Sequence, residues 1–150
     1  MKNPIRVGMA GLCHLLCLYT LSQPVRQTLP VKPLLFSRLP ERTVITSPLL
    51  DQLFRNEPSQ HVRIPLGTSS YIEGIITDKT VRNPTVTSLT IQCTNYDGAL
   101  LTLSRITGVH APDTYIGRVV NIRYGDVLLL TKQNDQYLLT KQKQSLVVVE

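Results

Sequence analysis

The stretch Thr85–Thr107, TVTSLTIQCTNYDGALLTLSRIT, contains two predicted strands joined by a tight turn. Side chains alternate along residues 85–95, and successive residues of a strand point to opposite faces. Asp97-Gly98 then accepts the positive φ angles that tight hairpins require, and a second strand follows from Ala99 to Thr107. The face that we expect to be buried holds Thr87, Leu89, Ile91 and Cys93. The stretch therefore predicts an antiparallel hairpin in which Cys93 is a small core residue.

Similar short segments lie on both sides of this hairpin, separated by turn residues. The predicted strands are 62–66, 71–77, 85–95, 99–107, 114–124, 127–132, 136–141 and 145–149, with 81–84 as a connection. Gly74 is predicted to be a bulge or a close-packing site. Regular spacing without convincing helices between the strands is typical of an all-β fold. We expect a small antiparallel barrel or sandwich of about seven strands within residues 59–150.

The first 22 residues have the three-part layout of a secretory signal peptide. Residues 1–6 carry two basic side chains, and residues 7–21 carry no formal charge. Thr20 and Ser22 then place small side chains at positions −3 and −1 of a cut before residue 23. The uncharged run is shorter than the roughly 20 residues that a membrane-spanning helix needs. We expect export to the periplasm, the cell surface or the medium, with membrane contact only if this segment stays uncleaved.

Residues 23–58 are predicted to form a proline-rich linker, because proline removes a backbone donor and disfavours helix in the preceding residue. One short helix is expected near residues 48–56, capped by Ser47 and with Pro48 in its first position. Its apolar face would hold Leu49, Leu50, Leu53 and Phe54. We expect this helix to plug one end of the β core. The alternative is a helix that docks on a partner.

The charge of the chain does not indicate a nucleic-acid partner. The formal net charge is +6, but Lys2 and Arg6 belong to the predicted signal peptide. Basic residues elsewhere are scattered among acidic ones, whereas nucleic-acid binders concentrate them on one face. No nucleic-acid partner is therefore expected.

One predicted strand, 114–124, nevertheless carries candidate partner-contact residues of aromatic and basic type. These are Tyr115, Arg118, Arg123 and Tyr124. Oligonucleotide-binding barrels stack bases on such aromatic side chains beside a basic groove. Strand alternation, however, would place Tyr115 and Arg123 on one face and the other two on the opposite face.

The sequence predicts no catalytic residue, metal site or cofactor site. His61 and His110 lie about fifty residues apart, without partners at the spacing of zinc ligands. Cys93 is expected to be buried, which raises the pKa of a thiol and suppresses its reactivity. The acidic residues of the β domain fall mostly in predicted turns, where carboxylates have a local structural role.

These observations favour a non-enzymatic exported module that binds or supports another macromolecule, such as another exported protein. One alternative is a small-ligand-binding protein or an enzyme whose site forms only in three dimensions. A second alternative is an oligonucleotide-binding barrel. Residues 145–150, SLVVVE, are expected to complete the domain's own sheet, or else to add a strand to a partner's sheet edge.

The export prediction can be checked by the intact mass of the protein in fractionated cells. We expect a chain that begins at residue 23, recovered from the cell envelope or the medium. A full-length chain in the cytosol would contradict export. A full-length chain in the membrane would contradict cleavage.

Overall fold

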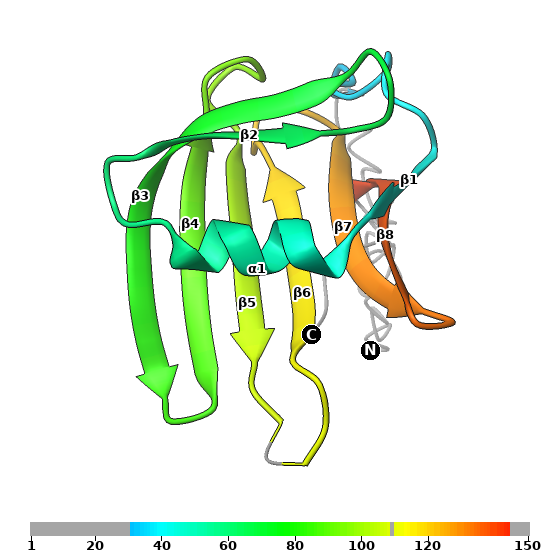
Figure 1. The fold of residues 1–150 in the computed structure, drawn as a ribbon. Coiled ribbons are helices and arrows are strands. Elements are labelled where there is room, and N and C mark those ends of the chain that lie inside the picture. The colour runs from blue at the N-terminus through cyan, green and yellow to red at the C-terminus, as the bar shows by residue number, and fades with distance from the viewer. Residues whose placement is uncertain (1–30, 109, 145–150) are drawn as a thin grey trace, which may run out of the picture. The chain divides into compact units, whose positions relative to one another are not determined.

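The computed structural model describes residues 31–108 and 110–144, which form one antiparallel sheet and one short helix. The elements are β1 (Arg42–Ile45), α1 (Ser47–Arg55), β2 (His61–Pro65), β3 (Tyr71–Asn83), β4 (Val86–Cys93), β5 (Leu100–Ile106), β6 (Thr114–Val120), β7 (Asp126–Gln133) and β8 (Gln136–Lys143). The eight strands follow the order β1-β8-β7-β6-β5-β4-β3-β2. The sheet curls into a half-barrel, with β1 and β2 at its edges (Figure 1). The prediction of an antiparallel, mostly β fold is confirmed.

Residues 31–58 belong to this folded unit, whereas the sequence predicted a linker as far as residue 58. β1 pairs with β8, and Phe36 is fully buried in the core. The carboxylate of Asp126 accepts the backbone N–H groups of Leu35 and Phe36 at 2.7 and 2.8 Å. The prolines keep this segment out of regular structure, and the Asp126 side chain, distant in sequence, supplies acceptors for its backbone N–H groups. The predicted signal peptide and the start of the predicted linker, residues 1–30, lie outside the described residues.

The short helix exists and covers the core of the domain. Its N-cap is Thr46 rather than Ser47, no side chain caps it, and proline occupies the first turn. Leu50, Leu53 and Phe54 are buried. Because α1 lies across the open front of the curled sheet (Figure 1), its apolar face packs against the protein's own core.

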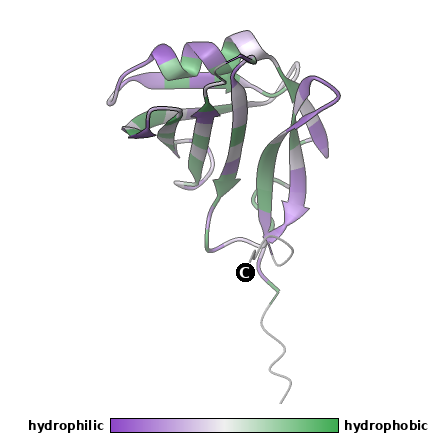
Figure 2. Ribbon diagram, turned by 90° about the horizontal axis from the view of Figure 1, so that it is seen from below, coloured by the Kyte–Doolittle hydropathy of each residue, from purple (hydrophilic) through white to green (hydrophobic). Residues whose placement is uncertain are grey.

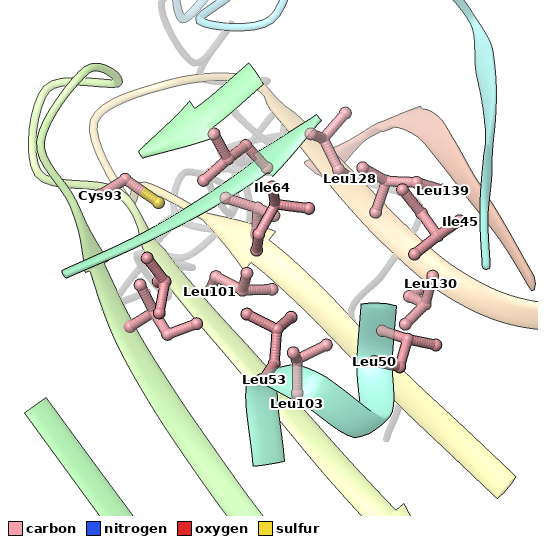
Figure 3. Close-up of a cluster of buried hydrophobic side chains, with 14 of the residues drawn as sticks. Ile45, Leu50, Leu53, Ile64, Cys93, Leu101, Leu103, Leu128, Leu130 and Leu139 are labelled. Carbon is pink, nitrogen blue, oxygen red and sulfur yellow. The ribbon is translucent and has the colours of Figure 1, made fainter. Parts of the chain in front are cut away.

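All eight strands contribute apolar side chains to one core beneath α1 (Figure 3). The alternation that produces this inner face is visible as bands of hydropathy along the strands (Figure 2). Leu89, Ile91 and Cys93 are buried together, as predicted from the hairpin. The space left inside is a cavity of about 20 Å³. A single water molecule needs about 10–15 Å³ on this measure, so the interior has room for about one water and for no larger ligand.

Two tight turns confirm the predicted hairpins. Asp97 and Gly98 have φ angles of 47° and 70° between β4 and β5. Asn134 and Asp135 have φ angles of 47° and 60° between β7 and β8. Two residues with positive φ are typical of the turns that match the twist of paired strands.

Gly74 is a close-packing site, one of the two roles predicted for it. A side chain there would overlap the carbonyl oxygen of Gln92 on β4. The irregularity in pairing comes slightly later, between Ile76 and Asp78.

Two predicted boundaries are wrong, and one strand cannot be compared. β3 continues through 81–83, where a connection was expected, because β4 pairs with it almost to the turn at Pro84. β6 ends at Val120, so residues 121–125 form a turn instead of extending the strand. The predicted strand 145–149 lies outside the described residues.

The place of residues 31–39 in the core can be tested by truncating Phe36. We expect Phe36→Ala to lower the free energy of unfolding by about 3–5 kcal/mol, because it removes a fully buried aromatic ring. Leu34→Ala is the matched control, since Leu34 is 54% exposed and its loss should change stability by about 0.5 kcal/mol or less. Urea denaturation measures both variants. Equal stability of the two variants would show that residues 31–39 are not part of the core.

Candidate functional site

The pairing between β6 and β7 is incomplete. It runs from Val120↔Val127 to Gly117↔Leu130, although both strands continue beyond that point. The next pair would join Ile116 to Thr131, but the two strands diverge there (Figure 1). The sheet therefore has an opening along part of its length.

Tyr137 of β8 closes this opening from the inner side. Its hydroxyl accepts the backbone N–H of Tyr115 at 3.2 Å and donates to the carbonyl of Asp113 at 3.2 Å. The Tyr137 ring belongs to the core cluster and packs edge-on against Tyr115, with 5.5 Å between ring centroids. A side chain thus replaces the missing strand contact at the start of β6.

On the opposite side of the sheet the same opening forms a groove of about 320 Å³. We call it the outer groove. Its lining comes from β5, β6 and β7 and consists of Thr102, Ser104, Ile116, Gly117, Arg118, Leu129, Leu130 and Thr131. Ile116 is 48% exposed, whereas Leu130 is buried and also belongs to the core cluster. The groove therefore combines apolar side chains with three hydroxyl groups and one guanidinium.

Arg118 supplies the charge of the outer groove. It lies between Thr102 of β5 and Leu129 of β7 in one row across the sheet. The row continues through Thr140 to Arg42 on the edge strand β1. Within residues 31–108 and 110–144, no carboxylate lies within ion-pair distance of Arg118. Its charge is thus available to an acidic group from elsewhere.

The structure does not bring together the four residues that the sequence singled out. Tyr115 points inward and is buried, while Arg118 lies on the outer face. Arg123 and Tyr124 lie in the turn after β6, because that strand ends earlier than predicted. Both contact the hairpin residue Asp97, through an ion pair of 3.3 Å and a hydrogen bond of 3.0 Å. Arg123 and Tyr124 therefore connect the turn after β6 to the turn between β4 and β5.

Tyr115 connects α1 to the sheet. Its hydroxyl donates to the carboxylate of Asp51 on α1, and its ring lies 5.7 Å from that of Phe54. Burial and the bond to Asp51 raise the pKa of Tyr115 far above its ordinary value, so the phenol stays protonated. Arg105 completes this cluster above the Phe54 ring, at 5.2 Å. A phenol held in this way cannot stack on a nucleic-acid base.

The other chemical groups are distributed as follows. Among residues 31–108 and 110–144 there is no group of three metal-ligating side chains. His61 and His110 are exposed on β2 and in the loop before β6. No helix in the described part of the chain is long and apolar enough to cross a membrane.

We find no match among protein-family models, curated proteins or solved structures.

The outer groove was not predicted from the sequence, although one signal pointed to it. Three consecutive leucines, 128–130, cannot all face the core of a strand, because neighbouring side chains alternate. Leu128 and Leu130 are buried in the core, and Leu129 faces outward into the groove. An apolar residue at an outward-facing strand position is therefore the sequence signal that could have indicated the outer groove.

Cys93 provides a test of the buried core. Burial raises the pKa of its thiol from 9.0 to about 11. The unfolded thiol then ionises at lower pH than the folded one. The thiol's contribution to stability is therefore complete below pH 9 and is lost as the pH rises to about 11, by about 2–3 kcal/mol.

We expect the stability difference between wild type and Cys93→Ala to shrink by about this amount between pH 8 and pH 11. Urea denaturation at the two pH values measures it. The comparison cancels the ionisation of the tyrosines other than Tyr96, whose pKa is raised by burial and by the charge of Cys93. A difference that is constant with pH would contradict the burial of the thiol.

Proposed function

We propose that this protein is a non-enzymatic, exported binding or accessory module that binds another exported protein through the outer groove. The observation that carries the proposal is an apolar opening in the sheet that no described segment fills. Other apolar side chains of the same outer face are also exposed, namely Val44, Leu100 and Ile106. Exposed apolar side chains that line a groove are characteristic of interaction sites.

The interior supports binding over catalysis. An enzyme or a carrier of small ligands usually encloses its ligand in a pocket of about 300–1,000 Å³. The cavity inside this half-barrel is about 20 Å³ and is lined by aliphatic side chains alone. Cys93, which belongs to the core cluster, is buried, and burial raises the pKa of its thiol. Ligand contact is therefore expected at the outer face.

The shape of the outer groove favours an extended peptide segment as its ligand. The groove lies where one further pairing between β6 and β7 would fall, so it follows the strand direction. Extended segments bind sheets through alternate side chains and main-chain hydrogen bonds. Ile116 and Leu129 offer apolar contacts, while Thr102, Ser104 and Thr131 offer hydroxyls. Arg118 favours a segment that carries an acidic residue.

A small amphiphilic acid is the second candidate ligand. The groove volume of about 320 Å³ falls at the lower end of the range for small-molecule sites. An oligonucleotide has less support. β2–β8 form a seven-stranded meander with β1 added beside β8, unlike the five-stranded Greek-key barrel of oligonucleotide-binding folds, and Tyr115 is buried.

Export itself remains part of the proposal and is supported by residues 1–22. Their basic start, uncharged run and small residues match a signal peptide.

Photo-crosslinking in the producing cells tests the binding proposal. We expect p-benzoylphenylalanine at position 116 to yield a discrete adduct with another exported protein. The matched control is position 81, since Val81 is also apolar and is 71% exposed, but lies at the end of β3 outside the groove. Leu129→Glu should abolish the adduct, because it places a charge in the apolar part of the groove. An equal adduct at both positions, or none at position 116, would contradict the proposal.

A further inference from the structure

We propose that one end of the domain binds the surface of an anionic lipid membrane, through a patch of apolar and basic side chains that is separate from the outer groove. We call it the end patch. Its side chains come from residues 31–34, from the turn after β6 and from the end of β8. They are Val31, Lys32, Leu34, Ile122, Arg123 and Lys143.

Gly125 brings the three segments of the end patch together. Its backbone N–H donates to the carbonyl of Pro33 at 2.8 Å, and its carbonyl accepts the N–H of Gln144 at 2.8 Å. The carbonyl oxygen of Lys32 would lie only 3.0 Å from a Cβ atom at position 125, so glycine suits this close approach. The ammonium group of Lys32 also donates to the carbonyl of Ile122 at 2.7 Å. The three segments are thus fixed side by side.

The end patch contains strongly exposed apolar side chains. Within residues 31–108 and 110–144, the two most exposed large apolar side chains are Val31 at 98% and Ile122 at 78%. Leu34, on the same segment as Val31, is 54% exposed. Exposed apolar side chains that lie close together mark sites of contact with a protein or a membrane.

The charges of the end patch favour an anionic surface. Among the described residues, no carboxylate lies within ion-pair distance of Lys32 or Lys143, and both lysines are exposed. Two carboxylates at this end of the domain are engaged elsewhere. Asp97 pairs with Arg123 at 3.3 Å, and Asp126 is 2% exposed and accepts backbone N–H groups. The charges of the two lysines are thus available to anionic groups from outside the domain.

The composition of the end patch distinguishes a lipid surface from a protein partner. Protein interfaces are depleted in lysine and enriched in aromatic side chains. The end patch instead combines two lysines with three aliphatic side chains, and the neighbouring Tyr124 is bound to Asp97. Aliphatic side chains enter the boundary between lipid headgroups and acyl chains, while lysine keeps its ammonium group among anionic headgroups.

The end patch and the outer groove can act at the same time. The patch lies at the turn between β6 and β7, whereas the groove lies around Gly117 and Leu130. From Gly125 to Leu130 the chain advances five residues, or about 16 Å along a strand. The sequence predicted membrane contact only through an uncleaved N-terminal segment, so this contact is additional and does not rest on the proposed function.

Fluorescence quenching by brominated lipid tests the proposal in the full chain. Cys13 and Cys17 are replaced by serine, and Cys93 is protected by its burial. A bimane fluorophore is attached at Ile122→Cys or, as the matched control, at Val81→Cys, since Val81 is 71% exposed near the opposite end of the strands. The anionic vesicles are an equimolar mixture of phosphatidylglycerol and brominated phosphatidylcholine. The neutral vesicles contain brominated phosphatidylcholine alone.

We expect quenching in anionic vesicles to be at least about threefold greater at position 122 than at position 81, because only the end patch enters the headgroup region. Lys32→Gln combined with Lys143→Gln should raise the lipid concentration for half-maximal quenching by about 25-fold, because each basic residue beside anionic lipid contributes about fivefold in affinity. Leu129→Glu, in the outer groove, should change neither value.

Three results would overturn the proposal. The first is equal quenching at positions 122 and 81. The second is quenching at position 122 that is the same in neutral vesicles or is unchanged by the two lysine substitutions, since the patch would then not recognise anionic lipid. The third is a photo-crosslinked protein adduct at position 122 without quenching in anionic vesicles, which would assign the end patch to a protein partner.

Discussion

The end of the pairing between β6 and β7 at Gly117↔Leu130 is the constraint on which the rest of the site depends. If β6 and β7 stayed paired beyond Gly117 and Leu130, the outer face of the sheet would have no groove at this place. Because the strands diverge, the inner side must be closed by another group, and the hydroxyl of Tyr137 provides this closure. The outer side stays open as an apolar groove with one arginine.

α1 and the irregular chain around Phe36, which both precede β2 in the sequence, stabilise the interior of the half-barrel. α1 covers the core and is linked to β6 through Asp51 and Tyr115. The irregular chain around Phe36 is held by the carboxylate of Asp126, 90 residues away. These contacts fill the space that a carrier of small ligands would keep empty. The outer groove is therefore the place that we propose for ligand recognition.

Local patterns in the sequence predicted the parts of the fold that depend on local chemistry. Alternation and Asp97-Gly98 predicted the β4–β5 hairpin and the burial of Cys93. Local patterns could not predict the structure of residues 31–45, because these residues are held by Asp126 and β8, which are far away in sequence. The groove arises from a pairing that stops, and strand propensity contains no signal for that. Only the outward Leu129 indicated it. Alternation along β6 places Tyr115 and Arg118 on opposite faces, and Arg123 and Tyr124 fall in the following turn because β6 ends at Val120.

The most direct measurement is a methyl NMR titration of the protein with an extended peptide of alternating valine and glutamate residues. If the outer groove binds an extended apolar segment, the methyl signals of Ile116 and Leu129 should shift saturably, whereas those of Val81, outside the groove, should not. Shifts at Ile116 and Leu129 that are no larger than those at Val81 would contradict the assignment of the groove as a binding site.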